Sequence, residues 1–224
     1  MSNLTMKNVT YRYGNSSTTA VKDVSCAFAP GTLYAVIGPS GSGKSTMLSM
    51  LAGLDLPTEG DVCYGEQSLK DMDLDQYRRE TVAMIFQAFQ LFPLLTVMEN
   101  VCYPMELMGI PQKDAKPRAE EFLLRVGITK EQMKRFPSHL SGGEQQRVAI
   151  ARSLASGAKI LLADEPTGNL DGANTENIMD ILRSLAREDG YCVIVVTHDM
   201  EVAETADVVY RMRDGAIVTG DDLT

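Results

Sequence analysis

The sequence is poor in several residue types that mark specialised proteins. Its 224 residues include no tryptophan and only two histidines, and 21 lysines and arginines stand against 30 aspartates and glutamates. The net charge of −9 disfavours a protein that binds DNA or RNA, because phosphate contacts need clustered cations. It does not exclude a small anionic ligand, whose charge one lysine, backbone amides and a metal ion can balance.

Long apolar runs are missing as well. The longest, such as 34–37 and 193–196, have the length of a strand and fall far short of the ~18 residues that a membrane span needs. Residues 1–7 lack the charged and apolar regions of a signal peptide. The four cysteines are widely spaced with no CxxC pair, which disfavours disulfides and a zinc site. We therefore expect a cytosolic protein.

The hydrophobic pattern at both ends of the chain predicts β structure. Alternating apolar residues up to about residue 30 indicate antiparallel strands, and 58–70 is a second short β segment. Asp214 and Gly215 stand between apolar runs and predict a hairpin turn. Short continuous apolar runs predict buried strands at 32–37, 159–163 and 191–197.

Helical spacing takes over in the middle of the chain. It predicts helices at 97–108, 115–126 and 142–155. Pro117 fits only the first turn of a helix, which leaves the start of the second helix open. We expect one α/β domain, 1–224, with its core at about 1–86 and 157–224 and a helical insert at about 88–156.

A glycine-rich turn with a lysine follows the buried strand 32–37. Residues 38–45 read Gly-Pro-Ser-Gly-Ser-Gly-Lys-Ser, which matches G-x-x-x-x-G-K-[ST]. Glycines let consecutive backbone N–H groups point at phosphate oxygens, and the following helix adds its unpaired N–H groups and positive dipole end. Lys44 can reach the β- and γ-phosphates, and the Ser45 hydroxyl can bind Mg²⁺. The sequence therefore predicts a phosphate-binding loop (P-loop).

Two consecutive carboxylates end the predicted strand 159–163. Asp164 and Glu165 would lie at the carboxyl edge of the sheet, where ligands bind in open α/β folds. Asp164 suits Mg²⁺, directly or through water, and Glu165 suits the polarisation of an attacking water. The pair alone is weak evidence, since helix caps and surface turns use the same residues. With a P-loop upstream, it predicts a P-loop NTPase.

A second candidate anion site lies at the start of the helix 142–155. Residues 140–147 read Leu-Ser-Gly-Gly-Glu-Gln-Gln-Arg, in which Ser141 fits a helix cap and the two glycines leave backbone amides accessible. Two phosphate-binding helix ends in one chain are most simply used in a head-to-tail dimer, with each ATP between the P-loop of one subunit and this segment of the other. Arg152, later in the helix, is expected to pair with a carboxylate or cap a helix.

Together these motifs strongly resemble the ATP-binding-cassette (ABC) ATPases, and the resemblance covers nearly the whole chain. The matching motifs are Walker A at 38–45, the Q-loop glutamine Gln87, the signature at 140–146, Walker B at 160–165, the D-loop at 169–171 and the switch histidine His198. The fold that the resemblance implies is an α/β P-loop NTPase core with an antiparallel β subdomain and an inserted α-helical subdomain.

The resemblance also implies a catalytic and a metal-binding set. Glu165 would be the general base, and His198 would contact the γ-phosphate and align the water. Gln87 would contact Mg²⁺ and the water and relay the nucleotide state to a membrane partner. The residues implied to surround Mg²⁺ are Ser45, Gln87 and Asp164.

ATP would be the nucleotide. The residues implied to bind it are Tyr13, Gly38, Pro39, Ser40, Gly41, Ser42, Gly43, Lys44, Ser45, Thr46, Ser141, Gly142, Gly143, Glu144 and Asp171. The signature residues and Asp171 would act across the interface of an ATP-dependent homodimer. Tyr13 falls where the family stacks an aromatic ring on adenine, and Tyr11 is a nearby competitor.

The apolar segment after Gln87 is a candidate docking surface. Residues 90–95 read Gln-Leu-Phe-Pro-Leu-Leu, and plain core packing is the alternative interpretation. In ABC ATPases this region forms a groove for a short cytoplasmic helix of the membrane subunit. The resemblance therefore implies an integral membrane permease that docks near Gln87–Leu95.

Within the family, the chain looks most like the lipoprotein-releasing and macrolide-exporter ATPases. The segments that carry this likeness are 38–48, 54–60, 86–101 and 164–171. They imply an ATPase on the cytoplasmic face of a bacterial membrane that energises movement of a lipoprotein, peptide or antimicrobial. Two alternatives stay open: a polar amino-acid importer ATPase, and a soluble ABC-type ATPase that acts on nucleic acid or protein assembly. The acidic charge and the apolar segment after Gln87 favour the transporter, so we expect no nucleic-acid partner.

Overall fold

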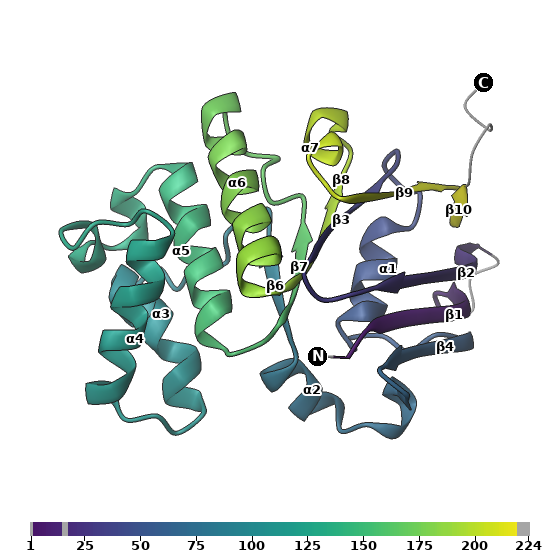
Figure 1. Cartoon of the computed structure of the whole chain (residues 1–224), viewed down its shortest axis with the longest axis horizontal. Helices are drawn as coiled ribbons and strands as arrows, with labels where there is room; N and C mark the ends of the chain where they lie inside the picture. The colour runs from purple at the N-terminus through teal and green to yellow at the C-terminus, as the bar shows by residue number, and fades with distance from the viewer. Residues whose placement is uncertain (1, 15–17, 219–224) are drawn as a thin grey trace.

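The computed structural model describes residues 2–14 and 18–218. These residues form two β-sheets and seven α-helices (Figure 1). The strands are β1 (Leu4–Arg12), β2 (Thr19–Phe28), β3 (Thr32–Ile37), β4 (Glu59–Tyr64), β5 (Gln67–Ser68), β6 (Val82–Phe86), β7 (Ile160–Asp164), β8 (Cys192–Thr197), β9 (Val208–Arg213) and β10 (Ala216–Val218). The α-helices are α1 (Lys44–Leu51), α2 (Leu74–Glu80), α3 (Val97–Leu107), α4 (Gln112–Arg125), α5 (Gly142–Ala155), α6 (Gly172–Asp189) and α7 (Met200–Glu204).

The larger sheet has the strand order β10-β9-β3-β8-β7-β6, and all of its neighbouring strands except β9 and β10 pair in parallel. Its central strand β8 is buried at every residue because helices cover both faces. Val193 and Val195 pack in the cluster that includes α6, whereas Ile194 and Val196 pack in the cluster that includes α1. Burial on both faces explains why this strand reads as a continuous apolar run.

The smaller sheet is antiparallel, with the order β2-β1-β4-β5. One face of it shares a core cluster with α1, in which Leu4, Val24 and Phe28 lie with Met47 and Leu51. The antiparallel strands expected before residue 30 and in the segment 58–70 are confirmed. The small polar residues at 14–19 predict a turn in the sequence, and that prediction falls partly on residues outside the described ranges.

Helices α3, α4 and α5 form a group at the end of the molecule opposite β1, β2 and β4 (Figure 1). Two of them begin with capping boxes: Thr96 pairs with Glu99 at α3, and Ser141 pairs with Glu144 at α5. A mixed α/β fold with this helical group agrees with the fold class that we expected. The division of the chain near residues 88 and 156 stays a prediction.

The structure differs from the sequence-based expectations in the middle of the chain. Helix α4 begins at Gln112, so Pro117 lies in its second turn and our restriction of this proline to the first turn is wrong. Proline at this position removes one helical N–H donor. The first turn of the helix, which begins after the N-cap Pro111, is complete before it. We assigned no structure to α2 or β6. Helix α2 buries only Tyr77, too little for an apolar pattern. None of the helices within the described ranges is long and apolar enough to span a membrane.

Candidate functional site

The P-loop joins β3 to α1 and has the geometry of an anion cradle. Gly43, the N-cap of α1, has φ +101°, and a Cβ there would lie 2.3 Å from the carbonyl oxygen of Ala20. A Cβ at Gly38 would lie 2.1 Å from the carbonyl oxygen of Met212. Both positions therefore require glycine on steric grounds. No side chain caps α1, so its first N–H groups can bind an anion.

Lys44 is the cation of this loop. Its side chain is buried, and Nζ donates to the carbonyl oxygens of Gly38 at 2.7 Å and Pro39 at 3.0 Å. These two neutral acceptors hold the ammonium group above the loop. They leave its charge without a carboxylate partner among the described residues, which suits an incoming phosphate group.

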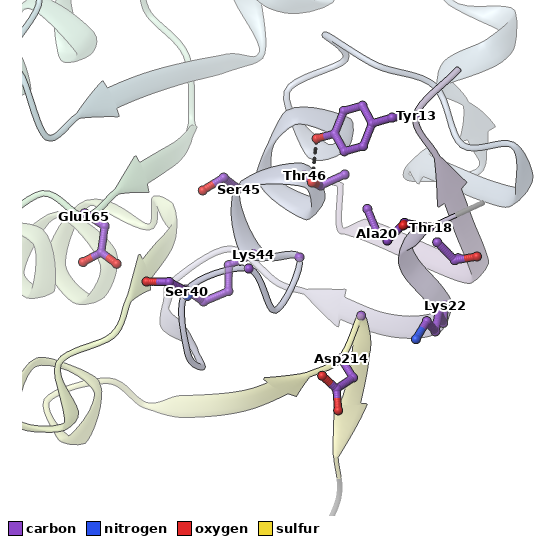
Figure 2. A pocket seen from close by; sticks show the side chains of 14 residues that line it. Tyr13, Thr18, Ala20, Lys22, Ser40, Lys44, Ser45, Thr46, Glu165 and Asp214 are labelled. Atoms are coloured by element: carbon purple, nitrogen blue, oxygen red, sulfur yellow. Dashed lines mark hydrogen bonds between the residues drawn. The ribbon is translucent and has the colours of Figure 1, made fainter. Parts of the chain in front are cut away.

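A cavity of about 760 Å³ opens in front of the P-loop (Figure 2). It brings together the residues just after β1 and β7, residues of β2, the P-loop and α1, and the β9–β10 turn. The described residues that line it are Tyr13, Thr18, Thr19, Ala20, Lys22, Ser40, Gly41, Gly43, Lys44, Ser45, Thr46, Glu165, Asp214 and Gly215. The expected hairpin turn at Asp214 and Gly215 is confirmed, and Gly215 N donates to the Ser42 carbonyl oxygen at 3.0 Å. Sequence reasoning missed that this turn supports the P-loop.

Tyr13 forms one wall of the cavity. Its side chain is 52% exposed, and its hydroxyl lies 2.7 Å from the Thr46 hydroxyl on α1 (Figure 2). Tyr11 is partly buried and is not among the described lining residues. Of the two candidate aromatic residues, Tyr13 is therefore the one that faces the cavity.

Ser45 and Asp164 meet between α1 and β7. The Ser45 hydroxyl donates to Oδ1 of Asp164 at 3.3 Å, although the two residues are far apart in the sequence. Burial raises the pKa of the Asp164 carboxyl, with a further contribution from the neighbouring Glu165. This hydroxyl and this partly buried carboxylate, which forms no ion pair with a described residue, are hard oxygen donors suited to Mg²⁺.

Glu165 and His198 form a second pair at the ends of β7 and β8. Oε1 of Glu165 lies 2.8 Å from Nδ1 of His198. Glu165 has φ +48°, a conformation that non-glycine residues seldom adopt, and its N–H donates to the Val196 carbonyl oxygen at 2.9 Å. This backbone turn sends the side chain toward the cavity, where it is labelled in Figure 2.

Gln87 follows β6, the strand next to β7, and its side chain bonds a different partner. Its side-chain Nε2 donates to Oδ1 of Asn169 at 3.3 Å, and Asn169 Nδ2 returns a bond to the Gln87 carbonyl oxygen at 3.1 Å. A Cβ at Gly168 would lie 2.7 Å from Gln87 Nε2, so the small residue makes room for this pair. Sequence reasoning named Gln87 but missed its partner. The structure thus does not join Gln87 to Ser45 and Asp164.

The signature residues also lie away from the P-loop. Among the described residues that line the cavity, none belongs to 141–144. Ser141 caps α5, and a Cβ at Gly143 would lie 2.1 Å from Oδ1 of Asn174 on α6. Asp171 is exposed and caps α6 by accepting from Asn174 N at 2.9 Å. Ser141, Gly143 and Asp171 therefore have structural roles within the chain, and their part in phosphate binding stays a prediction.

The segment after Gln87 is built around consecutive residues with positive φ, Phe89 at +57° and Gln90 at +52°. Arg152 of α5 donates to the carbonyl oxygens of both, so its expected pairing with a carboxylate or helix cap is wrong. The groove beside it is lined by Gln90, Phe92, Tyr103, Pro104, Leu107, Arg152 and Ser153. Exposed apolar side chains, Leu94 at 87% and Leu107 at 70%, make plain core packing an inadequate explanation of this surface.

Comparison with known families decides the assignment. The family described as ABC transporter matches residues 21–168, more than half of the chain. The chain belongs to the ABC transporter ATP-binding family. An ABC ATPase of this kind binds and hydrolyses ATP.

Relatives with known names support the finer resemblance. The chain is 40% identical over 210 residues to the lipoprotein-releasing system ATP-binding protein LolD of Idiomarina loihiensis, which covers 92% of each chain. It is 40% identical over 218 residues to the macrolide export ATP-binding/permease protein MacB of a Shewanella species, covering 96% of this chain and 33% of MacB. This ABC ATPase is therefore similar to LolD and to the ATP-binding portion of MacB.

A solved structure shares the fold over nearly the full length. It is the dimeric ATP-binding cassette MJ0796, of Methanocaldococcus jannaschii, in a post-hydrolysis state with ADP and Pi. The TM-score is 0.84 at 40% identity, and the match covers 99% of both chains. The expected P-loop ABC ATPase fold and ATPase activity are confirmed at the level of the family.

Proposed function

We propose that this ABC ATPase hydrolyses Mg·ATP with Glu165 as general base and powers a membrane transporter of the lipoprotein-releasing and macrolide-exporter type. The contact between Glu165 and His198, 2.8 Å long beside the P-loop cavity, is the observation that carries the catalytic part. A carboxylate only accepts hydrogen bonds, so Nδ1 of His198 donates and fixes the carboxylate. The carboxylate oxygens can then take a proton from a water directed at the γ-phosphate.

The remaining residues of the cavity bind the nucleotide. Lys44 and the α1 N-terminus hold the phosphates, and Tyr13 stacks on adenine. Ser45 and Asp164 hold Mg²⁺, which supplies charge neutralisation for the phosphates. Gln87 would join this set through its amide oxygen, and the movement would break the bond from its Nε2 to Asn169. Loss of the hydrogen bond between Gln87 and Asn169 would transmit nucleotide binding to the segment after Gln87.

Two copies act together, head to tail. The signature residues 141–144 lie outside the cavity of their own chain, which supports their use by a second copy. In that arrangement the α5 N-terminus of one subunit adds its N–H groups to the γ-phosphate held by the other, and Asp171 lies near the shared interface. The dimeric MJ0796 cassette is the structural precedent among similar proteins.

The partner is an integral membrane permease on whose cytoplasmic face the ATPase sits. The groove of Phe92, Tyr103 and Leu107 lies next to the Gln87 segment and exposes apolar surface of the kind that receives an amphipathic helix. The likeness to LolD and MacB favours a lipoprotein, peptide or antimicrobial as cargo over the substrates of a polar amino-acid importer. The acidic net charge favours this partner over nucleic acid.

The test is capture from detergent-solubilised native membranes. Tagged Glu165→Gln protein with Mg·ATP should retain an integral membrane protein that mass spectrometry identifies, and one with a large extracytoplasmic domain supports the lipoprotein-releasing and macrolide-exporter type. A Leu107→Glu variant should lose that protein, whereas the matched variant Leu124→Glu, at an exposed leucine of α4, should keep it. Recovery of only soluble or nucleic-acid partners would contradict the transporter proposal and favour the soluble ATPase.

A further inference from the structure

A second tyrosine lies against Tyr13, the aromatic wall of the cavity. Tyr11 stands two residues earlier in β1, and the two ring centroids are 5.0 Å apart with an angle of 89° between the ring planes. Tyr13 is 52% exposed, whereas Tyr11 is partly buried and packs against the core cluster that contains α1. An edge-to-face contact of this kind is the favoured geometry for two aromatic rings. The ring of Tyr13 therefore has a defined neighbour on the side away from solvent.

Tyr11 is itself anchored. Its hydroxyl donates to Oδ1 of Asp55 at 3.2 Å, and Oδ2 of Asp55 accepts from the Ser49 hydroxyl at 2.6 Å. Burial, reinforced by Asp55, raises the pKa of the Tyr11 phenol, so the hydroxyl remains a donor at neutral pH. Ser49 belongs to α1, the helix that starts at Lys44. Asp55 thus links β1, which carries Tyr11 and ends one residue before Tyr13, to the helix that carries the phosphate-binding lysine.

We infer that Tyr11 and Asp55 are positioning residues for the nucleotide base: Asp55 holds Tyr11, and Tyr11 holds the Tyr13 ring in the orientation that stacks on adenine. The inference rests on the proposed function, which places the base against Tyr13. An exposed tyrosine without such support populates several rotamers, and a ligand that selects one of them loses affinity. The contact of the Tyr13 hydroxyl with Thr46 of α1 also fixes the ring relative to the phosphate-binding residues. Together these contacts form one rigid unit, which sets the distance between base and phosphates.

Binding measurements separate this role from general support of the fold. Tyr13→Ala should weaken ATP binding about tenfold, and Tyr11→Phe and Asp55→Ala should each weaken it about two- to fivefold. Affinity for inorganic tripolyphosphate, which has no base, should stay the same in all three variants. In a Tyr13→Ala background, Asp55→Ala should have no further effect, because the ring that it positions is gone. Tyr64→Phe, at a partly buried tyrosine of the neighbouring strand β4, is the matched control and should bind ATP normally.

The absence of tryptophan supplies a second readout. Tyr13→Trp creates the only tryptophan of the chain, and ATP but not tripolyphosphate should quench its fluorescence. Adding Asp55→Ala should lower the anisotropy of that tryptophan in the nucleotide-free protein. Tyr11→Phe retains the ring and the fold, so the test does not depend on tolerance of Asp55→Ala alone.

Four results would overturn the inference. Equal loss of ATP and tripolyphosphate affinity in Asp55→Ala and Tyr11→Phe, or a loss that persists without Tyr13, would make the two residues merely structural. Normal ATP binding by Tyr13→Ala with strong loss in Tyr11→Leu would make Tyr11 the stacking residue. A wild-type protein that binds neither ATP nor tripolyphosphate would refute the proposed function itself, and this outcome is distinct from the other three.

Discussion

Nδ1 of His198 and Oε1 of Glu165 lie 2.8 Å apart, at the carboxyl ends of the neighbouring parallel strands β8 and β7. Because the carboxylate accepts, the proton is on Nδ1, and Nε2 remains available for a ligand. The His198 side chain is 65% exposed, whereas that of Glu165 is 19% exposed. The pair therefore presents a fixed, largely shielded carboxylate to the P-loop cavity and leaves the imidazole exposed.

Lys44→Ala should weaken ATP binding about 10- to 100-fold, because it removes a charge-assisted contact worth about 1.5–3 kcal/mol. The buried ammonium already sits within the loop, held by the carbonyl oxygens of Gly38 and Pro39. Calorimetry with Mg·ATP measures the loss. Lys113→Ala, at an exposed lysine of α4, is the matched control and should bind as the wild type does. Unchanged affinity in Lys44→Ala would refute its phosphate role.

Asp164→Asn should stabilise the nucleotide-free protein at pH 7.5. Burial raises the pKa of this carboxyl, so the ionised form destabilises the folded state at every pH above that pKa. Asparagine carries no charge and keeps an acceptor for Ser45. The melting temperature in EDTA should rise by about 2 °C or more. The difference from wild type should shrink as pH falls and the wild-type carboxyl takes up its proton.

The same variant should lose its advantage when ligand is present. Mg·ATP should raise the melting temperature of the wild type and leave Asp164→Asn nearly unchanged, because the metal ligand is gone. A lower melting temperature for Asp164→Asn than for the wild type in EDTA would show that the buried carboxylate does not destabilise the folded state.

Ser141→Arg should bind ATP normally and fail to dimerise, since the long cation fills the space expected for the other copy's γ-phosphate. Ser141 also caps α5, so its loss alone costs about 1 kcal/mol. Ser141→Ala therefore separates the two effects: it should melt earlier, like the arginine variant, and still form the ATP-dependent dimer. An ATP-dependent dimer of Ser141→Arg in gel filtration would rule out the head-to-tail arrangement.

Arg152→Ala should loosen the segment after Gln87. It removes the donors to the carbonyl oxygens of Phe89 and Gln90, at a cost of about 2 kcal/mol. Limited proteolysis should then cleave within 88–95 earlier in the variant than in the wild type. Arg118→Ala, at an exposed arginine of α4, is the control. Equal protection of this segment in Arg152→Ala and wild type would show that the arginine does not hold it.

Much of the site was predictable because its signals are local. The P-loop, Asp164 and Glu165 combine short spacing with a strand and a helix beside them. In the structure Glu165 lines one cavity with the P-loop, and Asp164 accepts from Ser45 of that loop. The antiparallel strands and the helices α3 and α5 follow directly from apolar periodicity. Helix α2 gave no such signal, because it buries only one residue and therefore shows no apolar periodicity. The local feature that marks its start is the N-cap Asp73.

The unpredicted features are contacts between residues far apart in the sequence. Gln87 pairs with Asn169, Arg152 holds the segment at 89–90, and Tyr11 donates to Asp55. Each depends on how elements pack, and the residue types alone permit many other partners. Arg152 shows the difficulty plainly, because a charged side chain suggested a carboxylate and instead satisfies two backbone carbonyl groups of a turn with positive φ.

Turnover and assembly state of Glu165→Gln in Mg·ATP test the central claim most directly. The substitution keeps the size of the side chain and removes the base, so hydrolysis should fall at least about 100-fold while ATP binding persists. The protein should then elute from gel filtration as a dimer with ATP and as a monomer without it. Near-normal turnover, or a monomer that holds ATP, would contradict a hydrolytic site built on Glu165 and shared between two copies.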